Sequence, residues 1–255
     1  MDIVGIDLGS RSVKIVEFKD GSMLKSNVID TAKFYREYCT NLHGALDINF
    51  SKLGVADFEE IVSTGYGKNN VNVKNSKKIV ELRAHLCGAV YSTGFSDFVL
   101  LDVGGQDSKI ILVEDERAKD IVLNDKCAAS CGRYLENMAN VLGMTLDELT
   151  KYSKDPVTLN STCAIFSESE LIGKIAAGED IEKLAAGVNY SLYKRIRPKL
   201  INFRKDTLVV TGGVSRNVAF IDFIKQDGLF LNVVVPPNTQ LNGAIGCCVY
   251  ALNKN

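Results

Sequence analysis

The sequence predicts an α/β protein of two lobes, each built around the same strand, glycine turn and strand. The stretch D-L-G-S-R-S-V-K-I-V at 7–16 recurs without a gap as D-V-G-G-Q-D-S-K-I-I at 102–111, with Asp, Gly, Lys and Ile in register. An apolar run precedes each copy and another follows it, which is typical of two strands joined by a tight turn. Elsewhere, β-rich runs alternate with segments of helical periodicity. The repeat therefore indicates one architectural unit present twice.

The composition is that of an ordinary globular protein, with 46% hydrophobic and 24% charged residues among 255. This length allows one large domain or two small ones, and the repeat favours two. A net charge of −1 gives no basic surface for nucleic acid. No apolar run reaches the roughly 20 residues that span a bilayer, and the chain starts directly into a strand. We therefore expect no nucleic-acid or membrane partner and a cytoplasmic location.

The first lobe is expected over residues 1–95. Its strands follow the apolar runs at 2–7, 12–18, 23–30 and 60–63, and a helix is expected near 31–46. A second helix is expected over 76–92, where the apolar residues share one broad face.

The second lobe is expected over residues 96–255 and restarts with the repeated hairpin at 98. A third strand ends near Leu123, and helices follow at 128–143, 146–153, 163–177 and 180–203. The β-rich run 207–211 ends at two glycines before a helix at 215–226, and the strand 231–235 is broken by two prolines. A last helix, 239–252, could return to pack on the first lobe.

The repeated turn has the features of a phosphate-binding hairpin. Its glycine lets backbone N–H groups approach an anion, and an aspartate at the strand end can hold a magnesium-bound water. Two such hairpins facing each other would grip the phosphates of a nucleotide from both sides. We assign Asp7 and Asp102 to Mg²⁺ through water and count Asp102 as catalytic. The other phosphate-site residues are Gly9, Ser10, Arg11, Ser12, Gly104, Gly105, Gln106 and Asp107.

Three side chains of the two hairpins leave alternatives open. Lys14 and Lys109 match each other in the repeat, and each is either a phosphate contact or merely solvated. Gln106 is our candidate for orienting the attacking water, although it could only brace the turn.

Three segments resemble the two phosphate motifs and the adenosine motif of the superfamily of actin, Hsp70 and sugar kinases. In chain order they are Asp7-Leu-Gly-Ser, Asp102-Val-Gly-Gly-Gln-Asp-Ser-Lys and Thr211-Gly-Gly-Val-Ser-Arg-Asn217. Within it, the chain resembles the BadF/BadG/BcrA/BcrD-type ATPases that activate 2-hydroxyacyl-CoA dehydratases. Further matching segments are Gly65-Tyr66-Gly67, Asn124-Asp-Lys-Cys-Ala-Ala, Gly132-Arg-Tyr-Leu-Glu136, Ser161-Thr-Cys-Ala-Ile-Phe-Ser-Glu168 and Val235-Pro-Pro.

This resemblance implies two RNase H-like, actin-like ATPase lobes with a nucleotide cleft between them. ATP or ADP would bind with Mg²⁺, and Gly212, Gly213 and Asn217 would contact the adenosine. Gly243 would let the last helix approach the nucleotide closely.

The resemblance also implies a homodimer with one 4Fe–4S cluster at the subunit interface. ATP hydrolysis would be coupled to delivery of one low-potential electron to a 2-hydroxyacyl-CoA dehydratase or a related double-cubane iron–sulfur reductase. Reduced ferredoxin or flavodoxin would be the electron donor. Carried onto this sequence, the cluster ligands would be Cys127 and Cys163 of both subunits.

The cysteines fit this chemistry as residues. Seven of them in a chain without a secretory signal indicate reduced thiols or metal ligands rather than disulfides. Cys127 and Cys163 each lie at a predicted helix start, where the helix dipole favours thiolates and an anionic cluster. The alternative is that both are small buried hydrophobes, and zinc is disfavoured because no C-x-x-C pair is present.

Family members usually carry a small residue other than cysteine at the position of Cys131. Cys131 is either an alternative or additional ligand, on one helix face with Cys127, or a packed or near-cluster thiol. We expect Cys39, Cys87, Cys247 and Cys248 in the core. His43 and His85 are taken as structural or surface residues, and Glu168 and Glu170 as either groups near the cluster or interface, or a solvated face.

Two other functions remain open. A small-molecule kinase of the same superfamily would need a catalytic aspartate, for which Asp107 is a candidate, and a substrate pocket between the lobes. It gives no reason for two cysteines at helix starts. A non-catalytic, nucleotide-dependent assembly module like actin is the other alternative.

Overall fold

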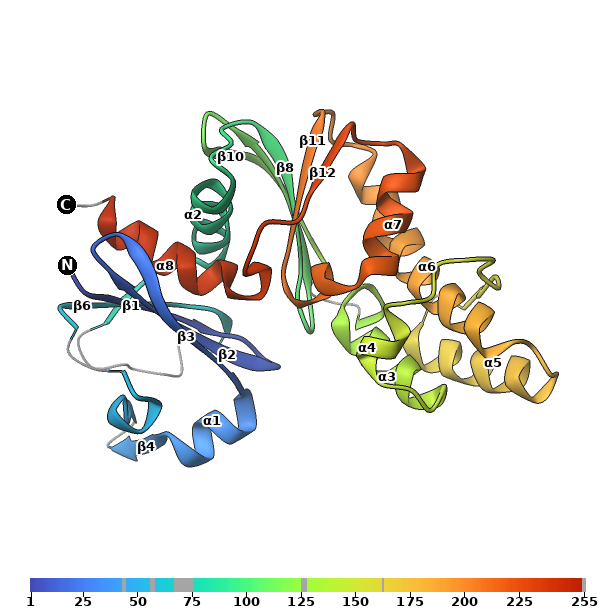
Figure 1. Ribbon diagram of the computed structural model, residues 1–255, viewed down its shortest axis with the longest axis horizontal. Helices are drawn as coiled ribbons and strands as arrows, with labels where there is room; N and C mark the ends of the chain where they lie inside the picture. Colours follow the sequence, from blue (N-terminus) through green and yellow to red (C-terminus); the bar gives the residue numbers. More distant parts are fainter. Residues whose placement is uncertain (43–44, 56–57, 67–75, 125–127, 162, 254–255) are drawn as a thin grey trace. The chain divides into compact units, whose positions relative to one another are not determined.

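A computed structural model of the chain describes residues 1–42, 45–55, 58–66, 76–124, 128–161 and 163–253. Its backbone divides into two compact units (Figure 1). Unit 1 contains Met1–Phe95 and Gln240–Asn255, and unit 2 contains Ser96–Thr239. The carboxyl-terminal segment, which we counted with the second lobe although its helix could pack back on the first, belongs to unit 1.

Unit 1 is built on a mixed sheet of five strands in the order β3-β2-β1-β6-β7. β1, β2 and β3 are antiparallel, whereas β6 and β7 continue the other side of the sheet in parallel. The strands are β1 (Ile3–Leu8), β2 (Ser12–Lys19), β3 (Ser22–Asp30), β6 (Glu60–Thr64) and β7 (Ser76–Lys78).

The two faces of this sheet carry separate hydrophobic cores, because side chains alternate along each strand. Val4, Ile6 and Leu8 of β1 pack with Phe34 of helix α1 (Thr31–Glu37) on one face. Ile3 packs on the other face with the helices α2 (Glu81–Thr93) and α8 (Asn242–Leu252). Figure 1 shows α2 and α8 side by side against the sheet.

Unit 2 repeats this topology, with strands in the order β10-β9-β8-β11-β12. β8, β9 and β10 are antiparallel, and β11 and β12 follow in parallel. The strands are β8 (Phe98–Val103), β9 (Ser108–Glu114), β10 (Arg117–Asn124), β11 (Thr207–Thr211) and β12 (Asn232–Val234). The repeat predicted from two ten-residue segments is confirmed, and it extends to all five strands of each sheet.

The helices of unit 2 lie between β10 and β11 or after β11. Their largest core combines Val99 and Leu101 of β8 with fully buried side chains such as Tyr134 and Leu192. The helices are α3 (Gly132–Val141), α4 (Leu146–Leu149), α5 (Ala164–Ala176), α6 (Ile181–Leu200) and α7 (Val218–Asp227). Short 3-10 turns cover Ser51–Leu53, Ala128–Ser130, Gly213–Arg216 and Thr239–Leu241.

Two predicted helices of the first lobe were too long. The helix expected at 31–46 ends at Glu37, and β4 (Cys39–Leu42) and β5 (Ala45–Ile48) pair as an antiparallel hairpin. The helix expected at 76–92 begins only at Glu81, because Ser76–Lys78 pairs with β6 as the edge of the sheet. In both places strand pairing outweighed a local helical pattern.

The predicted helix at 128–143 also begins later, at Gly132, and Cys131 is its extended N-cap residue. Cys131 therefore precedes the α-helix in which we expected it to share a face with Cys127, and Cys127 lies outside the described residues. Among the described residues, no helix is long and apolar enough to cross a membrane.

Close contact between α2 and α8 depends on glycines. A methyl group at Gly246 of α8 would collide with the backbone carbonyl of Ala84 in α2, and one at Gly88 would collide with that of Asn242. Backbone atoms cannot move aside as a flexible side chain can, so these positions admit no larger residue.

Gly246→Ala is therefore expected to destabilise the protein by roughly 1–3 kcal/mol or more, because the added methyl overpacks the contact between α2 and α8. Gly173→Ala is the matched control, since Gly173 also lies within a helix but a methyl there meets open space. That control should be neutral or stabilising by up to about 1 kcal/mol. Thermal unfolding of both variants checks the prediction, and an equal melting temperature for the two would contradict it.

Candidate functional site

The turn of unit 1 follows a buried aspartate at the end of β1. Asp7 is 4% exposed and lies opposite Lys14 of β2, whose Nζ is 3.1 Å from the Asp7 Oδ2. Burial of a carboxylate is costly unless a cation lies beside it, and Lys14 meets that need. Lys14 is therefore an ion-pair partner of Asp7 rather than a merely solvated side chain.

The rest of this turn is tied to the start of α1. The hydroxyl of Thr31 donates to the carbonyl of Gly9 at 2.7 Å, and the Arg11 guanidinium lies 2.6 Å from the Asp30 carboxylate. The Lys33 backbone N–H and the Arg11 charge hold the pKa of Asp30 below its usual range. Ser10 and Ser12 are half-buried beside them. The predicted phosphate turn is thus fixed by α1.

The turn of unit 2 has the same plan. Asp102 is 2% exposed at the end of β8, opposite the buried Lys109. The Lys109 Nζ is 2.6 Å from the Asp107 Oδ2 and 3.9 Å from the Asp102 Oδ2. The Gly104 N–H donates to the Asp107 carbonyl at 2.9 Å and closes the turn. Lys109 is therefore buried and paired with both aspartates, which excludes the solvated alternative.

Gln106 is exposed at the tip of this turn. Its side chain makes no hydrogen bond to the part of the turn that the structure describes, which disfavours the bracing role. Asp107, the candidate base of a kinase, is held by Lys109 instead.

Each unit also has a threonine followed by a glycine next to its aspartate, a part of the repeat that the sequence comparison of the two hairpins did not include. Thr64 lies beside Asp7, and Thr211 lies beside Asp102, in the same register. Thr211 Oγ1 donates to Asp102 Oδ1 at 2.8 Å, whereas Thr64 Oγ1 donates to a backbone carbonyl. Each threonine precedes a glycine with positive φ, +94° at Gly65 and +85° at Gly212. The sequence feature that could have revealed this match is a Thr-Gly pair at the end of a strand, as S-T-G at 63–65 and as V-T-G at 210–212.

Positive φ is needed here because the chain turns sharply against the strand that carries the aspartate. A Cβ on Gly65 would lie 2.8 Å from the Asp7 Oδ1. A Cβ on Gly212 would collide with the carbonyl of Val103.

The predicted adenosine residues of unit 2 follow directly. Gly213 opens a 3-10 turn, and the Asn217 side chain caps α7 by accepting from the Phe220 N–H at 2.9 Å. The Asn217 amide also donates to the Asn189 Oδ1 at 2.8 Å. Asn217 thus has a structural role in addition to the predicted ligand contact.

In unit 1, α8 brings Gly243 to the aspartate. A Cβ on Gly243 would lie 3.2 Å from the Asp7 Oδ2 and 3.4 Å from the His85 Cε1. His85 is buried, 3.6 Å from Glu81 in α2, and its carbonyl accepts from the Asn242 amide at 2.9 Å. His85, which we took as structural or surface, is therefore a neighbour of the predicted magnesium site. The sequence feature that could have indicated this position is the spacing of Glu81, His85 and Gly88, which places all three on one face of a helix.

The cysteines differ in their surroundings. Cys163 is half-buried as the N-cap residue of α5, with no side-chain cap, whereas Cys131 is fully buried. Full burial of Cys131 supports the packed-thiol alternative. Cys127 and His43 lie outside the described residues.

The remaining thiols lie in unit 1. Cys247 and Cys248 are buried in the core as expected, whereas Cys39 and Cys87 are only partly buried and pack against the core from outside. Burial and the Asp47 charge raise the pKa of Cys39 to about 12, and burial raises that of Cys248 to about 12. Burial likewise raises the pKa of Cys247 and Cys87. A metal ligand must be a thiolate, so these groups are poor candidates. The described residues hold no group of three or more His, Cys, Asp or Glu side chains that could bind a metal.

Glu170 has a defined role beside Cys163. Its carboxylate accepts from the backbone N–H groups of Asn160 and Ser161 at 2.9 Å each. These hydrogen bonds outweigh burial and hold the pKa of Glu170 below its ordinary value. Glu170 therefore fixes the segment that leads to Cys163, while Glu168 is exposed.

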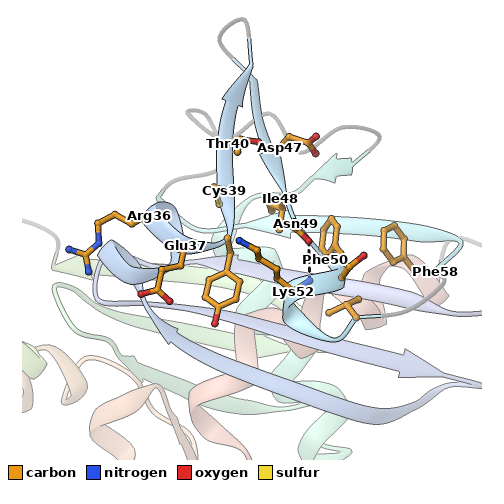
Figure 2. Close-up of a pocket in the computed structure, with 13 residues that line it drawn as sticks. Arg36, Glu37, Cys39, Thr40, Asp47, Ile48, Asn49, Phe50, Lys52 and Phe58 are labelled. Atoms are coloured by element: carbon orange, nitrogen blue, oxygen red, sulfur yellow. Dashed lines mark hydrogen bonds between the residues drawn. The ribbon is translucent and has the colours of Figure 1, made fainter.

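A hollow of about 740 Å³ lies elsewhere in unit 1, between the end of α1, β4 and β5 (Figure 2). Its lining mixes Arg36 and Lys52 with Glu37 and Asp47, beside Phe50 and other aromatic side chains. It shares no residue with either phosphate turn, and we assign it no part in the site.

Comparison with known proteins gives a consistent result. A sequence model of the BadF/BadG/BcrA/BcrD ATPase family matches residues 4–251. The activator of lactoyl-CoA dehydratase of Anaerotignum propionicum is 35% identical, with 98% of this chain and 97% of the relative covered. The (R)-2-hydroxyglutaryl-CoA dehydratase activating ATPase of Acidaminococcus fermentans is 31% identical over 98% and 97% of the two chains.

A solved structure resembles the whole chain. The activator of the 2-hydroxyisocaproyl-CoA dehydratase from Clostridium difficile with bound ADPNP gives a TM-score of 0.87 at 29% identity, covering 100% of this chain and 95% of that one. The predicted α/β class with actin-like ATPase units is confirmed.

Thr211→Val is expected to slow nucleotide hydrolysis about tenfold, because it removes a hydrogen bond from the buried Asp102 carboxylate and leaves that group free to shift. Thr64→Val is the matched control, since Thr64 is equally buried but donates to the Ile79 carbonyl and not to Asp7. Steady-state phosphate release by the two variants checks this, and equal losses would contradict it.

Proposed function

Since the chain belongs to the BadF/BadG/BcrA/BcrD ATPase family, we propose that it is an ATP-dependent one-electron reductase. Its electron would go to a 2-hydroxyacyl-CoA dehydratase or a related double-cubane iron–sulfur reductase. The names of its relatives support a dehydratase as the partner.

One observation of unit 2 carries this proposal. The Gly104 carbonyl accepts from the Gly132 N–H, and the Gly105 carbonyl accepts from the Arg133 N–H, each at 2.9 Å. A Cβ on Gly132 would lie 3.1 Å from the Gly104 carbonyl oxygen, so backbone meets backbone directly. The predicted phosphate turn is thus bonded to the first turn of α3, and the segment holding Cys127 leads into that helix. A conformational change in the phosphate turn would then reach the residues that follow Cys127 through backbone hydrogen bonds alone.

The residues around Cys163 fit a 4Fe–4S cluster. Cys163 precedes a helix of 13 residues whose first turn contains no acidic residue. Its N-terminal N–H groups and dipole favour an anionic group. Cys127 and Cys163 of two subunits would supply the four thiolates that such a cluster needs. When bound, the cluster would supply one-electron chemistry at low potential.

On the nucleotide side, the chain would hold Mg²⁺·ATP through its two aspartates. Asp7 and Asp102 would orient water on Mg²⁺, and the backbone N–H groups of Gly9 and Gly105 would contact the phosphates. The Gly104 N–H, which we had also assigned to the phosphates, closes the turn instead by donating to the Asp107 carbonyl. Gln106 is placed at the exposed tip of its turn, where a side chain can orient an attacking water. ATP and ADP would bias the protein between two conformations by binding them unequally.

The proposal includes a homodimer in the cytoplasm that receives its electron from reduced ferredoxin or flavodoxin. A kinase of the same superfamily is disfavoured, because the ion pair with Lys109 occupies Asp107, its candidate base. ATP hydrolysis without an added acceptor separates the two functions.

Protein purified without oxygen is expected to contain four iron and four acid-labile sulfide per dimer. Cys127→Ala and Cys163→Ala should each abolish both, because a ligand is lost, while nucleotide affinity stays unchanged. Cys131→Ala and Cys87→Ala are the controls and should retain the cluster. Iron and sulfide analysis checks this. A colourless, metal-free ATPase would overturn the electron-transfer function, and loss confined to Cys131→Ala would overturn the ligand assignment.

Asp102→Ala is expected to abolish ATP hydrolysis, by at least about a hundredfold, without bleaching the protein. The reason is that Asp102 lies at the phosphate turn and is not one of the proposed cluster ligands. The exposed Asp97→Asn is the control and should hydrolyse ATP normally. The visible absorbance of the purified protein and the rate of phosphate release measure the two properties. A colourless Asp102 variant would show that the two sites are not separable.

A further inference from the structure

The predicted cluster ligands belong to two stretches of unit 2 that are separate in sequence. Two ligands of one chain can bind the same cluster only if these stretches are kept close together. We call residues 128–131, which follow Cys127, the first cysteine segment, and residues 158–161, which lead towards Cys163, the second. The first segment lies between β10 and α3, and the second lies before α5. They are about thirty residues apart, so no local hydrogen bond of secondary structure joins them.

Arg195 of α6 contacts both segments. Its Nη2 donates to the Ser161 carbonyl at 2.7 Å and to the Ser167 hydroxyl of α5 at 3.0 Å. Its Nη1 reaches the Ala129 carbonyl at 3.5 Å. The guanidinium carbon also lies 4.3 Å from the centre of the Tyr134 ring in α3. One half-buried side chain on a third helix therefore links the first segment, the second segment, α3 and α5.

Only an arginine suits this position. The planar guanidinium presents several N–H donors in fixed directions, so it can bond oxygens of two segments at once while stacking on an aromatic ring. A lysine has one compact donor group and cannot reproduce the fork. The oxygens that accept from Arg195 are neutral, and no carboxylate within the described ranges pairs with it. Its positive charge is thus retained beside segments that would bind an anionic cluster.

We propose that Arg195 is a positioning residue that holds the two cysteine segments of one chain together, so that Cys127 and Cys163 reach the same cluster. This inference rests on the proposed function. It also extends the connection from the phosphate turn, because Tyr134, beneath Arg195, lies in the first turn of α3 that is bonded to Gly104 and Gly105.

The first test is hydrogen–deuterium exchange of the cluster-free protein, read by mass spectrometry. Arg195→Gln and Arg195→Lys are compared with Arg197→Gln. Arg197 is the matched control, because it lies on the same helix and is bonded to Asp227 at 2.8 Å instead of to a cysteine segment. In both Arg195 variants, peptides covering 128–136 and 158–167 should exchange at least about tenfold faster, as expected for lost hydrogen bonds of a charged group. Other peptides should not change.

The second test measures iron and sulfide after anaerobic reconstitution, and then the rate of iron loss to a chelator. Both Arg195 variants should lose iron at least about tenfold faster than the wild type, and Arg197→Gln should match the wild type. This readout needs no dehydratase and no ATP turnover.

The two tests separate the inference from the proposed function. Faster exchange in both peptides of a wild-type-like fold, in a protein that binds no iron, would support the link by Arg195 and overturn the electron-transfer function. Unchanged exchange, exchange raised throughout the chain, or the same effect in Arg197→Gln would overturn the role of Arg195. If Arg195→Lys behaved as the wild type, the positive charge at this position would be sufficient to hold the two segments. The proposed role of the planar guanidinium would then be wrong.

Discussion

A carboxylate buried at the end of a central strand must be neutralised, and both units meet this requirement with a lysine from the neighbouring strand. Asp7 is paired with Lys14, and Asp102 lies near Lys109 in the same register. The cost of an unpaired buried charge fixes the register of each hairpin. The glycine turns, the threonine beside each aspartate and the bend that follows it are all placed relative to these carboxylates. The repeat in the sequence is therefore a repeat of an electrostatic constraint.

Unit 2 adds helices to this common plan, and they connect the hairpin to the cysteine segments. Two backbone hydrogen bonds join the phosphate turn to α3, and Arg195 joins the start of α3 to the start of α5. The two backbone bonds use N–H groups at the start of α3, which have no intrahelical acceptor, and Arg195 donates to carbonyls of the segments that precede α3 and α5. A conformational change in unit 2 would therefore be concentrated at these junctions, where only a few hydrogen bonds join the phosphate turn, α3 and α5.

Unit 1 uses its helices differently. The chain returns from unit 2 as α8, which packs so closely on α2 that glycine is required at Gly88 and Gly246. This packing brings Gly243 to Asp7 and places His85 beside them. The carboxyl-terminal residues of the chain thus complete the surroundings of an aspartate near its amino terminus, and the hydrophobic core of unit 1 requires both ends of the sequence.

The sequence by itself determined the two hairpins, their aspartates and lysines, and the ends of most strands, because glycine turns and alternating apolar residues are local signals. It did not determine where the helix expected at 31–46 ends or where the helix expected at 76–92 begins. Pairing in the hairpin of β4 and β5 decided the first, and pairing of β7 with β6 decided the second. The partners of Lys109, Glu170 and Arg195 were also beyond it, because the sequence does not record which N–H group, carbonyl or carboxylate a side chain will meet in the folded chain. Only the tertiary structure brings together residues as distant as Ala129, Ser161 and Arg195, and it does so because buried polar groups must find partners wherever the packing places them.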